Sequence, residues 1–378
     1  MGESGERRFL IVAGEASGDA HAARLLTALG GLGPCRARGV AGPALLAAGA
    51  SRVVPMEDLA VLGFSGVVAR LPRIWSVYRR LLAEARSFRP HAAVLVDSPG
   101  FNFHLGPALR RLGVPVFYYI APQVWAWHPE RAARMARWVE RLAVIFPFEE
   151  ALFRQAGVRA RFVGHPLLEG LDPEVDGAGF RAEIGAAPDA PILGLLPGSR
   201  PQELRAHAPV MAGAARRLRA SRRGLAVVLA LAPGLEREAR RLCSALEGVR
   251  VVTGRTRAVQ AHATCCAVAS GTATLETALF GTPEVIVYRT GRLNYEIARR
   301  MVTLARIGLP NIVVGEEVAP ELLQGDLNVE RLAATLAPWL DDPGARGRQC
   351  ARLAAVRARL GGPGAARRAA EWLWEMVA

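Results

Sequence analysis

Two short turns in the second half of the sequence combine glycine, hydroxyl side chains and an arginine. The first, Pro197-Gly198-Ser199-Arg200, follows the apolar run Ile192–Leu196 and leads into a helical pattern. The second, Ser270-Gly271-Thr272, follows the apolar run Cys265–Ala269 and also leads into a helix. A strand that enters a helix through such a turn leaves the first helical amides unpaired and facing the loop, and this geometry predicts an anion site.

The side chains near these turns indicate what kind of anion would bind. Arg200 has a planar guanidinium with five donors, which suits two phosphate oxygens at once. Glu276, in the second turn of the later helix, has a carboxylate suited to a ribose diol, as acidic residues are in dinucleotide folds. The pair of turns therefore predicts a nucleoside diphosphate site. The plainer alternatives are an ordinary strand-to-helix connection and, for Glu276, a solvated helix residue.

Asp97 is the best general-base candidate in the chain. It follows the apolar strand Ala92–Val96 and precedes the turn Ser98-Pro99-Gly100. We therefore expect it at the tip of a central strand, where doubly wound enzymes keep their chemistry. The competing interpretation is a helix cap or turn residue, which is a common role for aspartate.

Two other loops of the first half could bind a sugar. The loop Gly14-Glu15-Ala16-Ser17-Gly18-Asp19 would repel phosphate and so favours hydroxyl groups, with helix capping by Asp19 as the alternative. The loop Ala121–His128 places Gln123 beside two tryptophans, Trp125 and Trp127, which could form a platform for sugar or acyl chain. Burial of the tryptophans under the next helix is the competing prediction.

The net charge of +14 comes entirely from arginine, because the sequence contains no lysine. This excludes a Walker-type phosphate lysine and Schiff-base chemistry, since both need an ε-amine. A pI near 10.9 favours polyanionic partners, either nucleic acid or an anionic membrane, although an arginine-rich composition alone explains much of the excess. No apolar run has the length of a transmembrane helix or the pattern of a signal peptide, so we expect a cytoplasmic protein.

One predicted helix, residues 67–88, could lie on a membrane. Its apolar and aromatic side chains fall on one face and are flanked by Arg70, Arg73, Arg79 and Arg80. The core face of a surface helix is the favoured interpretation of the same stripe, which comprises Leu71, Ile74, Trp75, Tyr78, Leu82 and Ala85. The helix expected after Trp127 has a second basic face, formed by Arg131, Arg134, Arg137 and Arg141.

Strands alternate with helices along the whole chain, which predicts two doubly wound, Rossmann-like parallel-sheet domains facing one cleft. We expect an N-terminal domain over residues 1–167, a linker over 168–191 where apolar strands are lacking, and a second domain over 192–364. The final helix, residues 365–378, is long enough to return to the first domain.

Seven motifs in this order resemble the lipid-A-disaccharide synthase family. Each is weak alone, but together they run from about Phe9 to Gln324. They are Val12–Asp19 (VAGEASGD), Val96–Asn102 (VDSPGFN), Pro122–Trp127 (PQVWAW), Gly164–Pro166 (GHP), Leu196–Arg200 (LPGSR), Ala269–Ala273 (ASGTA) and Leu309–Asn311 (LPN).

The resemblance implies the GT-B fold and an inverting glycosyl transfer. UDP-2,3-diacylglucosamine would react with 2,3-diacylglucosamine 1-phosphate to give the lipid A disaccharide 1-phosphate and UDP. The enzyme would sit peripherally on the cytoplasmic face of the anionic inner membrane, without a cofactor or metal, since no Asp-x-Asp motif occurs. A homo-oligomer is compatible with the sequence, and nucleic acid is not an expected partner.

The resemblance also implies a role for each matching residue. Asp97 is the expected base, and Arg200 is expected to stabilise the leaving group. The UDP-sugar side comprises Pro197, Gly198, Ser199, Arg200, Ser270, Gly271, Thr272, Glu276 and Asn311. The acceptor side comprises Glu15, Ser17, Asp19, Asn102, Gln123 and Trp125.

Two alternatives stay open at this point. A UDP-sugar epimerase of the same architecture would share the nucleotide half of the site. A basic nucleic-acid-binding protein would explain the charge, although no aromatic-basic RNA motif or recognition-helix signature occurs.

Overall fold

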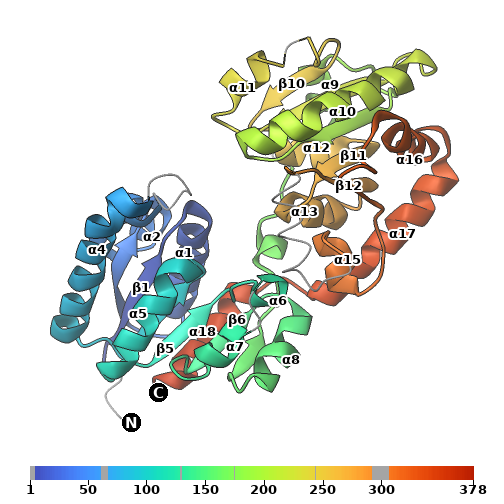
Figure 1. The fold of residues 1–378 in the computed structure, drawn as a ribbon. Coiled ribbons are helices and arrows are strands. Elements are labelled where there is room, and N and C mark those ends of the chain that lie inside the picture. The colour runs from blue at the N-terminus through green and yellow to red at the C-terminus, as the bar shows by residue number, and fades with distance from the viewer. Residues whose placement is uncertain (1–4, 61–66, 128–129, 174, 243, 292–305) are drawn as a thin grey trace. The chain divides into compact units, whose positions relative to one another are not determined.

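The computed structural model describes residues 5–60, 67–127, 130–173, 175–242, 244–291 and 306–378. The chain forms two compact units, one of Met1–Glu169 with Gly362–Ala378 and the other of Gly170–Gly361 (Figure 1). Among the described helices, none is long and apolar enough to cross a membrane.

The first unit is built on a seven-stranded sheet in which every pairing is parallel. The strand order reverses between β1 and β4. Strands β3, β2 and β1 lie on one side of this switch point, and β4 to β7 lie on the other. Their bounds, in spatial order, are β3 (Ser51–Pro55), β2 (Cys35–Ala41), β1 (Arg7–Ala13), β4 (Ala92–Val96), β5 (Val116–Tyr119), β6 (Arg141–Val144) and β7 (Ala160–Phe162). The central strands are apolar along their length because helices cover both faces of the sheet.

Helices pack on both faces of this sheet (Figure 1). One face is covered by α1 (Ala16–Gly30), α2 (Pro43–Ala47) and α18 (Ala365–Met376). The other is covered by α3 (Glu57–Ala60), α4 (Val67–Phe88), α5 (Pro99–Arg111), α7 (Glu130–Met135) and α8 (Pro147–Gln155). Short helices α6 (Val124–Trp127) and η1 (Pro166–Glu169) complete the unit.

The C-terminal helix α18 belongs to this first unit although the whole second unit precedes it in sequence. Trp372 and Leu373 are buried beside α1, and Trp372 lies edge-on to Phe117 of β5. Arg7 and Arg141 donate to the carbonyls of Trp374 and Trp372 respectively, which ties the helix to β1 and β6. The predicted return of this helix to the N-terminal half is therefore what the structure contains.

The amphipathic helix α4 packs mainly against the sheet. Its buried line is Val77, Leu81 and Ala85, with Ile74, Tyr78 and Leu82 partly buried beside it. Trp75 differs, because 60% of its surface is exposed. The favoured interpretation as a core face is thus right for most of the stripe, while Leu71 and Arg70 lie outside the described side chains.

The predicted basic helix after Trp127 is shorter than expected. Helix α7 ends at Met135, and Arg141 is not helical but begins strand β6. Arg141 is only 8% exposed, because its guanidinium reaches the backbone of α18. The prediction that Arg141 lies on the basic face of this helix is wrong.

The second unit contains a six-stranded, wholly parallel sheet of the order found in dinucleotide-binding domains. Its strands, in spatial order, are β10 (Arg250–Thr253), β9 (Ala226–Leu231), β8 (Ile192–Leu196), β11 (Cys265–Ala269), β12 (Glu284–Tyr288) and β13 (Glu321–Leu323). The prediction of two doubly wound parallel-sheet domains is confirmed. Residues 170–191, expected as a linker, fold with this unit, and Phe180 of α9 (Gly177–Ile184) is fully buried in its core.

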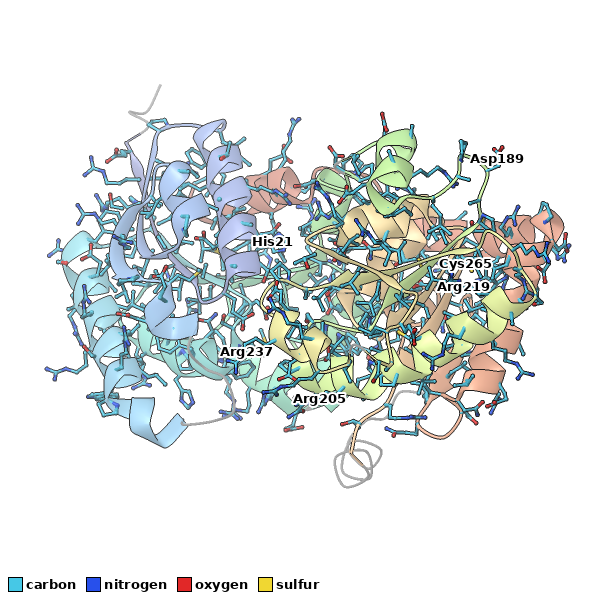
Figure 2. All side chains as sticks on the ribbon, turned by 90° about the horizontal axis from the view of Figure 1, so that it is seen from above. His21, Asp189, Arg205, Arg219, Arg237 and Cys265 are labelled. Atoms are coloured by element: carbon cyan, nitrogen blue, oxygen red, sulfur yellow. The ribbon has the colours of Figure 1, made fainter. Side chains whose placement is uncertain are left out.

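Helices cover both faces of the second sheet as well. Helices α10 (Pro201–Ala220) and α16 (Val329–Asp341) pack on one face, and α9 and α12 (Thr256–His262) pack on the other. Helix α13 (Thr272–Phe280) packs against α12, α15 (Leu309–Val314) and α17 (Pro343–Leu360). Cys265 lies inside the unit, whereas Arg205 of α10 and Arg237 of α11 (Glu236–Arg240) are exposed (Figure 2).

Candidate active site

The predicted site residues of the first unit follow three adjacent strands. Strand order reverses between β1 and β4, which pair directly with Ala13 opposite Val96. At such a switch point the loops leave toward opposite faces and open a ligand crevice at the carboxyl ends of the strands. Glu15 follows β1, Asp97 follows β4 and Gln123 follows β5, so the topology brings all three to one edge of the sheet.

Asp97 occupies the first position after β4 in an unusual backbone conformation. Its φ is +46°, and Ser98 follows with φ +44°. The side chain is half-buried. Burial, and secondly the negative charge of Glu15, raise the pKa of the Asp97 carboxyl to about 6. A base with a pKa close to the working pH combines a large ionised fraction with useful proton affinity.

Asn102 contacts Asp97 rather than solvent. The residue is fully buried in α5, and its Nδ2 donates to the Asp97 carbonyl oxygen at 2.7 Å. Tyr118, which sequence reasoning missed, donates its hydroxyl to the same oxygen at 2.5 Å. The sequence predicts that Asn102 contacts the acceptor, whereas in the structure its side-chain amide contacts the backbone of Asp97.

Glu15, Ser17 and Asp19 have different environments. Glu15 and Ser17 are exposed at the start of α1. Asp19 is 2% exposed, and its carboxylate accepts hydrogen bonds from the amides of Gly42, at 2.8 Å, and Ala44, at 2.8 Å. Asp19 therefore caps α2, a helix distant in sequence, whereas the alternative drawn from the sequence was a cap in its own turn.

The loop after β5 separates Gln123 from Trp125. Gln123 is exposed, while Trp125 is 7% exposed and donates its indole N–H to Glu149 at 2.9 Å. The Glu149 carboxylate also accepts from the Phe146 amide at 3.1 Å, and burial raises its pKa to about 7. Trp125 is packed edge-on against Phe146. The Trp125 ring is therefore part of the packing beneath the loop. Of Gln123 and Trp125, only Gln123 is exposed enough to contact a sugar.

The second unit repeats the same arrangement at its own switch point. Strands β8 and β11 pair directly, with Leu196 opposite Val268. Their turns, Pro197–Arg200 and Ser270–Thr272, therefore leave the sheet from neighbouring strand ends, as the sequence predicts.

The first turn is not free. Glu203 of α10 accepts hydrogen bonds from the amides of Ser199, at 3.0 Å, and Arg200, at 3.2 Å, and its other oxygen pairs with the Arg200 guanidinium at 2.8 Å. The prediction that this turn leaves its amides unpaired is wrong, because the helix carries its own anion in a capping box. A diphosphate at this turn would have to displace Glu203.

The second turn is open. The amides of Gly271, Thr272 and Ala273 bond to no residue in the described part of the chain, and Gly271 has φ +152°. Ser270 donates its hydroxyl to the carbonyl of Ile307 at 3.0 Å, so that side chain fixes the loop. The N-terminus of α13 is the freer of the two anion positions.

Glu276 lies one turn into α13 with 16% of its side chain exposed. Burial raises the pKa of this carboxyl, while the Arg257 guanidinium at 3.7 Å and a hydrogen bond with Gln260 act in the opposite direction. Neither partner was identified from the sequence, because α12 and α13 meet only in the fold. Arg257 and Gln260 thus hold the Glu276 carboxylate in place while part of its side chain stays exposed to solvent.

Asn311 and His207 organise the loops of the second unit. Asn311 is fully buried, donates to Glu321 at 2.7 Å and accepts from the amide of Val318 at 2.7 Å. His207 bridges the carbonyl of Pro197, at 2.8 Å, and the amide of Arg289, at 2.9 Å, and burial lowers its pKa. Since one ring nitrogen accepts from an amide, the neutral imidazole donates from Nδ1 to Pro197. Both residues are buried and hold loop backbone in place through these hydrogen bonds. The role of His207 was not predicted from the sequence.

Two Rossmann-like sheets, each with polar turns at its switch point, define the GT-B class of sugar-nucleotide enzymes. Solved structures of that class share the fold. A UDP-GlcNAc 2-epimerase from Neisseria meningitidis superposes with a TM-score of 0.68 at 11% identity, covering 97% of this chain and 100% of the other. The calicheamicin glycosyltransferase gives a TM-score of 0.59 at 18% identity, covering 99% and 98%. Identities this low establish the fold alone, so they leave the choice between epimerase and transferase open.

Sequence similarity makes that choice. The family described as lipid-A-disaccharide synthetase matches residues 9–360. Lipid-A-disaccharide synthases from Anaeromyxobacter sp. (strain K) and Myxococcus xanthus are 45% and 43% identical over 368 and 383 residues, covering 96% and 98% of this chain and 96% and 97% of their own length. The chain belongs to the lipid-A-disaccharide synthase family, and it is a glycosyltransferase of lipid A biosynthesis.

Proposed function

We propose that this chain transfers 2,3-diacylglucosamine from its UDP derivative to the 6-hydroxyl of 2,3-diacylglucosamine 1-phosphate. The products are the β-1,6-linked disaccharide 1-phosphate and UDP. The observation that carries the proposal is the match to the family over residues 9–360, together with the strand ends that the motif residues follow at the two switch points.

Asp97 is the proposed general base. As the acceptor oxygen attacks the anomeric carbon, Asp97 takes its proton, and the bond between that carbon and the diphosphate oxygen breaks from the opposite side. Burial of the carboxyl and the neighbouring Glu15 raise its pKa to about 6, so it is mostly ionised at neutral pH and still basic enough to accept the proton. In this proposal exposed Glu15, Ser17 and Gln123 hold acceptor hydroxyls, and buried Asp19, Asn102 and Trp125 position the loops.

The second unit is the proposed UDP-sugar site. The open amides at the start of α13 and the guanidinium of Arg200 would stabilise the charge that develops on the departing diphosphate. Glu276 would accept hydrogen bonds from the ribose hydroxyls. Ser199 and Thr272 are exposed and can donate their hydroxyls, while Asn311 fixes the loop beneath them. Glu203 occupies the anion position beside Arg200 and would give it up to the ligand.

We propose that the enzyme works peripherally on the cytoplasmic face of the inner membrane, where acylated substrates lie. Trp75 is 60% exposed on α4, and Arg73, Arg79 and Arg80 are exposed beside it. An aromatic ring with neighbouring arginines suits an anionic lipid surface. Replacing Trp75 and Arg79 with serine should shift the protein from anionic vesicles into solution, and unchanged vesicle binding would contradict this part of the proposal.

The activity itself is tested by incubating the protein with UDP-2,3-diacylglucosamine and the 1-phosphate acceptor. Formation of the disaccharide with stoichiometric release of UDP is the expected result. Conversion of the UDP-sugar to an epimer, with no disaccharide, would instead indicate the chemistry of the epimerases that share this fold.

A further inference from the structure

Backbone strain in the first unit is concentrated beside Asp97. Five described residues other than glycine have positive φ, and three of them stand at the ends of β4 and β5: Asp97 at +46°, Ser98 at +44° and Ile120 at +67°. Such conformations are costly for residues with a Cβ, above all for β-branched isoleucine, and they persist only where the surroundings enforce them. Contacts around Asp97 must therefore hold this backbone in its strained conformation.

Two buried side chains supply that enforcement. The Tyr118 hydroxyl and the Asn102 amide both donate to the carbonyl oxygen of Asp97, at 2.5 Å and 2.7 Å. Both residues are completely buried, and Tyr118 is fixed further by an edge-on contact with Trp138. A carbonyl oxygen has two lone pairs, so these two donors saturate it and fix the plane of the peptide that follows Asp97.

The turn is also constrained from β1. A Cβ added to Gly14 would lie 2.5 Å from the hydroxyl oxygen of Ser98 and 3.2 Å from its Cβ, so any larger residue at position 14 would require Ser98 to move. The carbonyl of Asp97 is held by two donors and Ser98 lies against Gly14, so the backbone on both sides of the Asp97 Cα is fixed, and with it the direction in which the side chain leaves the strand end.

We propose that Tyr118 and Asn102 are positioning residues that direct the carboxylate of Asp97 at the acceptor hydroxyl by holding its carbonyl in the strained turn. This inference rests on the proposed role of Asp97 as the base. It assigns no contact with substrate to either residue. Loss of either donor lets the turn relax toward an ordinary conformation, which moves the carboxylate away from the reacting oxygen.

Two adjacent tyrosines provide a matched pair for the test. Tyr118 and Tyr119 are both fully buried in β5, but they face opposite sides of the sheet. The Tyr119 hydroxyl has no hydrogen-bond partner within the described residues. Tyr118→Phe and Tyr119→Phe therefore remove the same atom from the same strand, and only the first breaks the contact with Asp97.

We expect Tyr118→Phe to lower kcat by roughly 10- to 100-fold, the range expected when a reacting group is misplaced by about 1 Å. KM for both substrates and the melting temperature should stay near those of the unmodified enzyme. Tyr119→Phe should leave kcat unchanged. Asn102→Leu, similar in size and unable to donate, should reproduce the kcat loss, and a rise in acceptor KM instead would make Asn102 a binding residue.

The double variant with Asp97→Asn separates this inference from the proposed function. If Tyr118 acts through Asp97, Tyr118→Phe has no further effect on kcat once Asp97 is asparagine. Equal kcat for Tyr118→Phe and Tyr119→Phe, or an undiminished loss in the Asp97→Asn background, overturns the positioning role and leaves the base assignment standing. Normal turnover of Asp97→Asn alone overturns the base assignment, and the positioning role with it.

Discussion

Asp97 and Glu15 are two carboxylates whose charges interact at the end of the first unit's central strands. Burial is the larger cause of the raised pKa of Asp97, and the charge of Glu15 adds to it. Because a base acts only when ionised, turnover should increase with pH as Asp97 loses its proton near pH 6. The pKa of the proposed base is thus adjusted by a second carboxylate, which in this proposal does not itself take the proton.

Replacing Glu15 with glutamine should shift this pH dependence. Removing a negative charge stabilises the ionised form of Asp97, so its pKa falls and the acidic limb of the kcat profile moves to lower pH. The measurement is kcat at saturating substrate between pH 5 and pH 8. A profile that coincides with that of the unmodified enzyme would show that the limb belongs to another group.

Arg200 makes a local ion pair with Glu203 and leaves 79% of its side chain exposed, so the fold does not depend on it. Arg200→Ala should leave the melting temperature unchanged. It should remove the proposed charge-assisted contact to the leaving group, which contributes about 1.5–3 kcal/mol, or roughly 10- to 100-fold in kcat/KM. Arg205→Ala, one turn further along α10, is the control and should behave normally. The assignment fails if both variants have the same kcat/KM.

At the scale of whole elements, helices and strands near the site are held by buried polar side chains. Asp19 of α1 caps α2, Glu149 caps α8 while holding Trp125, and Asn311 of α15 binds the segment that enters β13. Each of these side chains satisfies backbone amides that would otherwise be buried without a partner. Two of these three residues, Asp19 and Asn311, belong to the motifs, so buried motif residues help to build the loops in which the exposed motif residues stand.

Asp19→Ala measures this structural role. Loss of the cap should lower the free energy of unfolding by about 0.5–2 kcal/mol. The acceptor KM should change little, because the carboxylate is buried against α2. Ser17→Ala, at an exposed position of the same helix, should not alter stability. Unchanged stability with a raised acceptor KM would return Asp19 to the binding site.

Sequence patterns predicted the strands that end at the site because those strands are continuous apolar runs closed by turn residues. Ala92–Val96, Ile192–Leu196 and Cys265–Ala269 have the predicted bounds. Strand β6 was missed because it begins with Arg141, whose burial depends on α18, more than two hundred residues away. His207 and Tyr118 were missed for a similar reason, since their partners Arg289 and Asp97 lie at the ends of other elements and are not visible in local spacing. Glu203 differs, because its partners Ser199 and Arg200 are three to four residues away, so the spacing of a capping box could have identified it.

For the molecule as a whole, the arginine excess has a partly structural explanation. Many guanidinium groups donate to backbone carbonyls within their own unit, as Arg368 does to Val163, Arg216 to Ala245 and Arg219 to Gly248. The fixed fork of donors suits such contacts better than a lysine ammonium. Net charge alone is therefore a weak guide to the partners of this protein.

A buried carboxyl group, that of Glu284, should make the stability of the protein depend on pH. It lies in β12 opposite Cys266, fully buried, and neither carboxyl oxygen has a hydrogen-bond partner among the described residues. Burial raises its pKa well above the ordinary value of 4.5. Since the folded state keeps a proton that the unfolded chain releases, stability should fall as the pH rises above 4.5 toward the folded-state pKa.

Glu284→Gln removes this titration. Its melting temperature should exceed that of the unmodified protein at pH 8, and the difference should diminish toward pH 5. Glu330→Gln, at an exposed position on α16, should show no such dependence. A difference in melting temperature that is the same at both pH values would exclude a buried, titrating Glu284.

The central proposal places the general base in the first unit and the UDP-sugar site in the second. It is tested most directly by Asp97→Asn, measured for both turnover and UDP binding. Asparagine keeps the shape of the side chain but cannot take a proton, so kcat should fall by roughly 10²–10⁴-fold. UDP affinity and the melting temperature should stay unchanged, because the proposed nucleotide site lies in the other unit. Near-normal turnover would contradict the account, as would a joint loss of UDP affinity and stability, which would make Asp97 a structural turn residue.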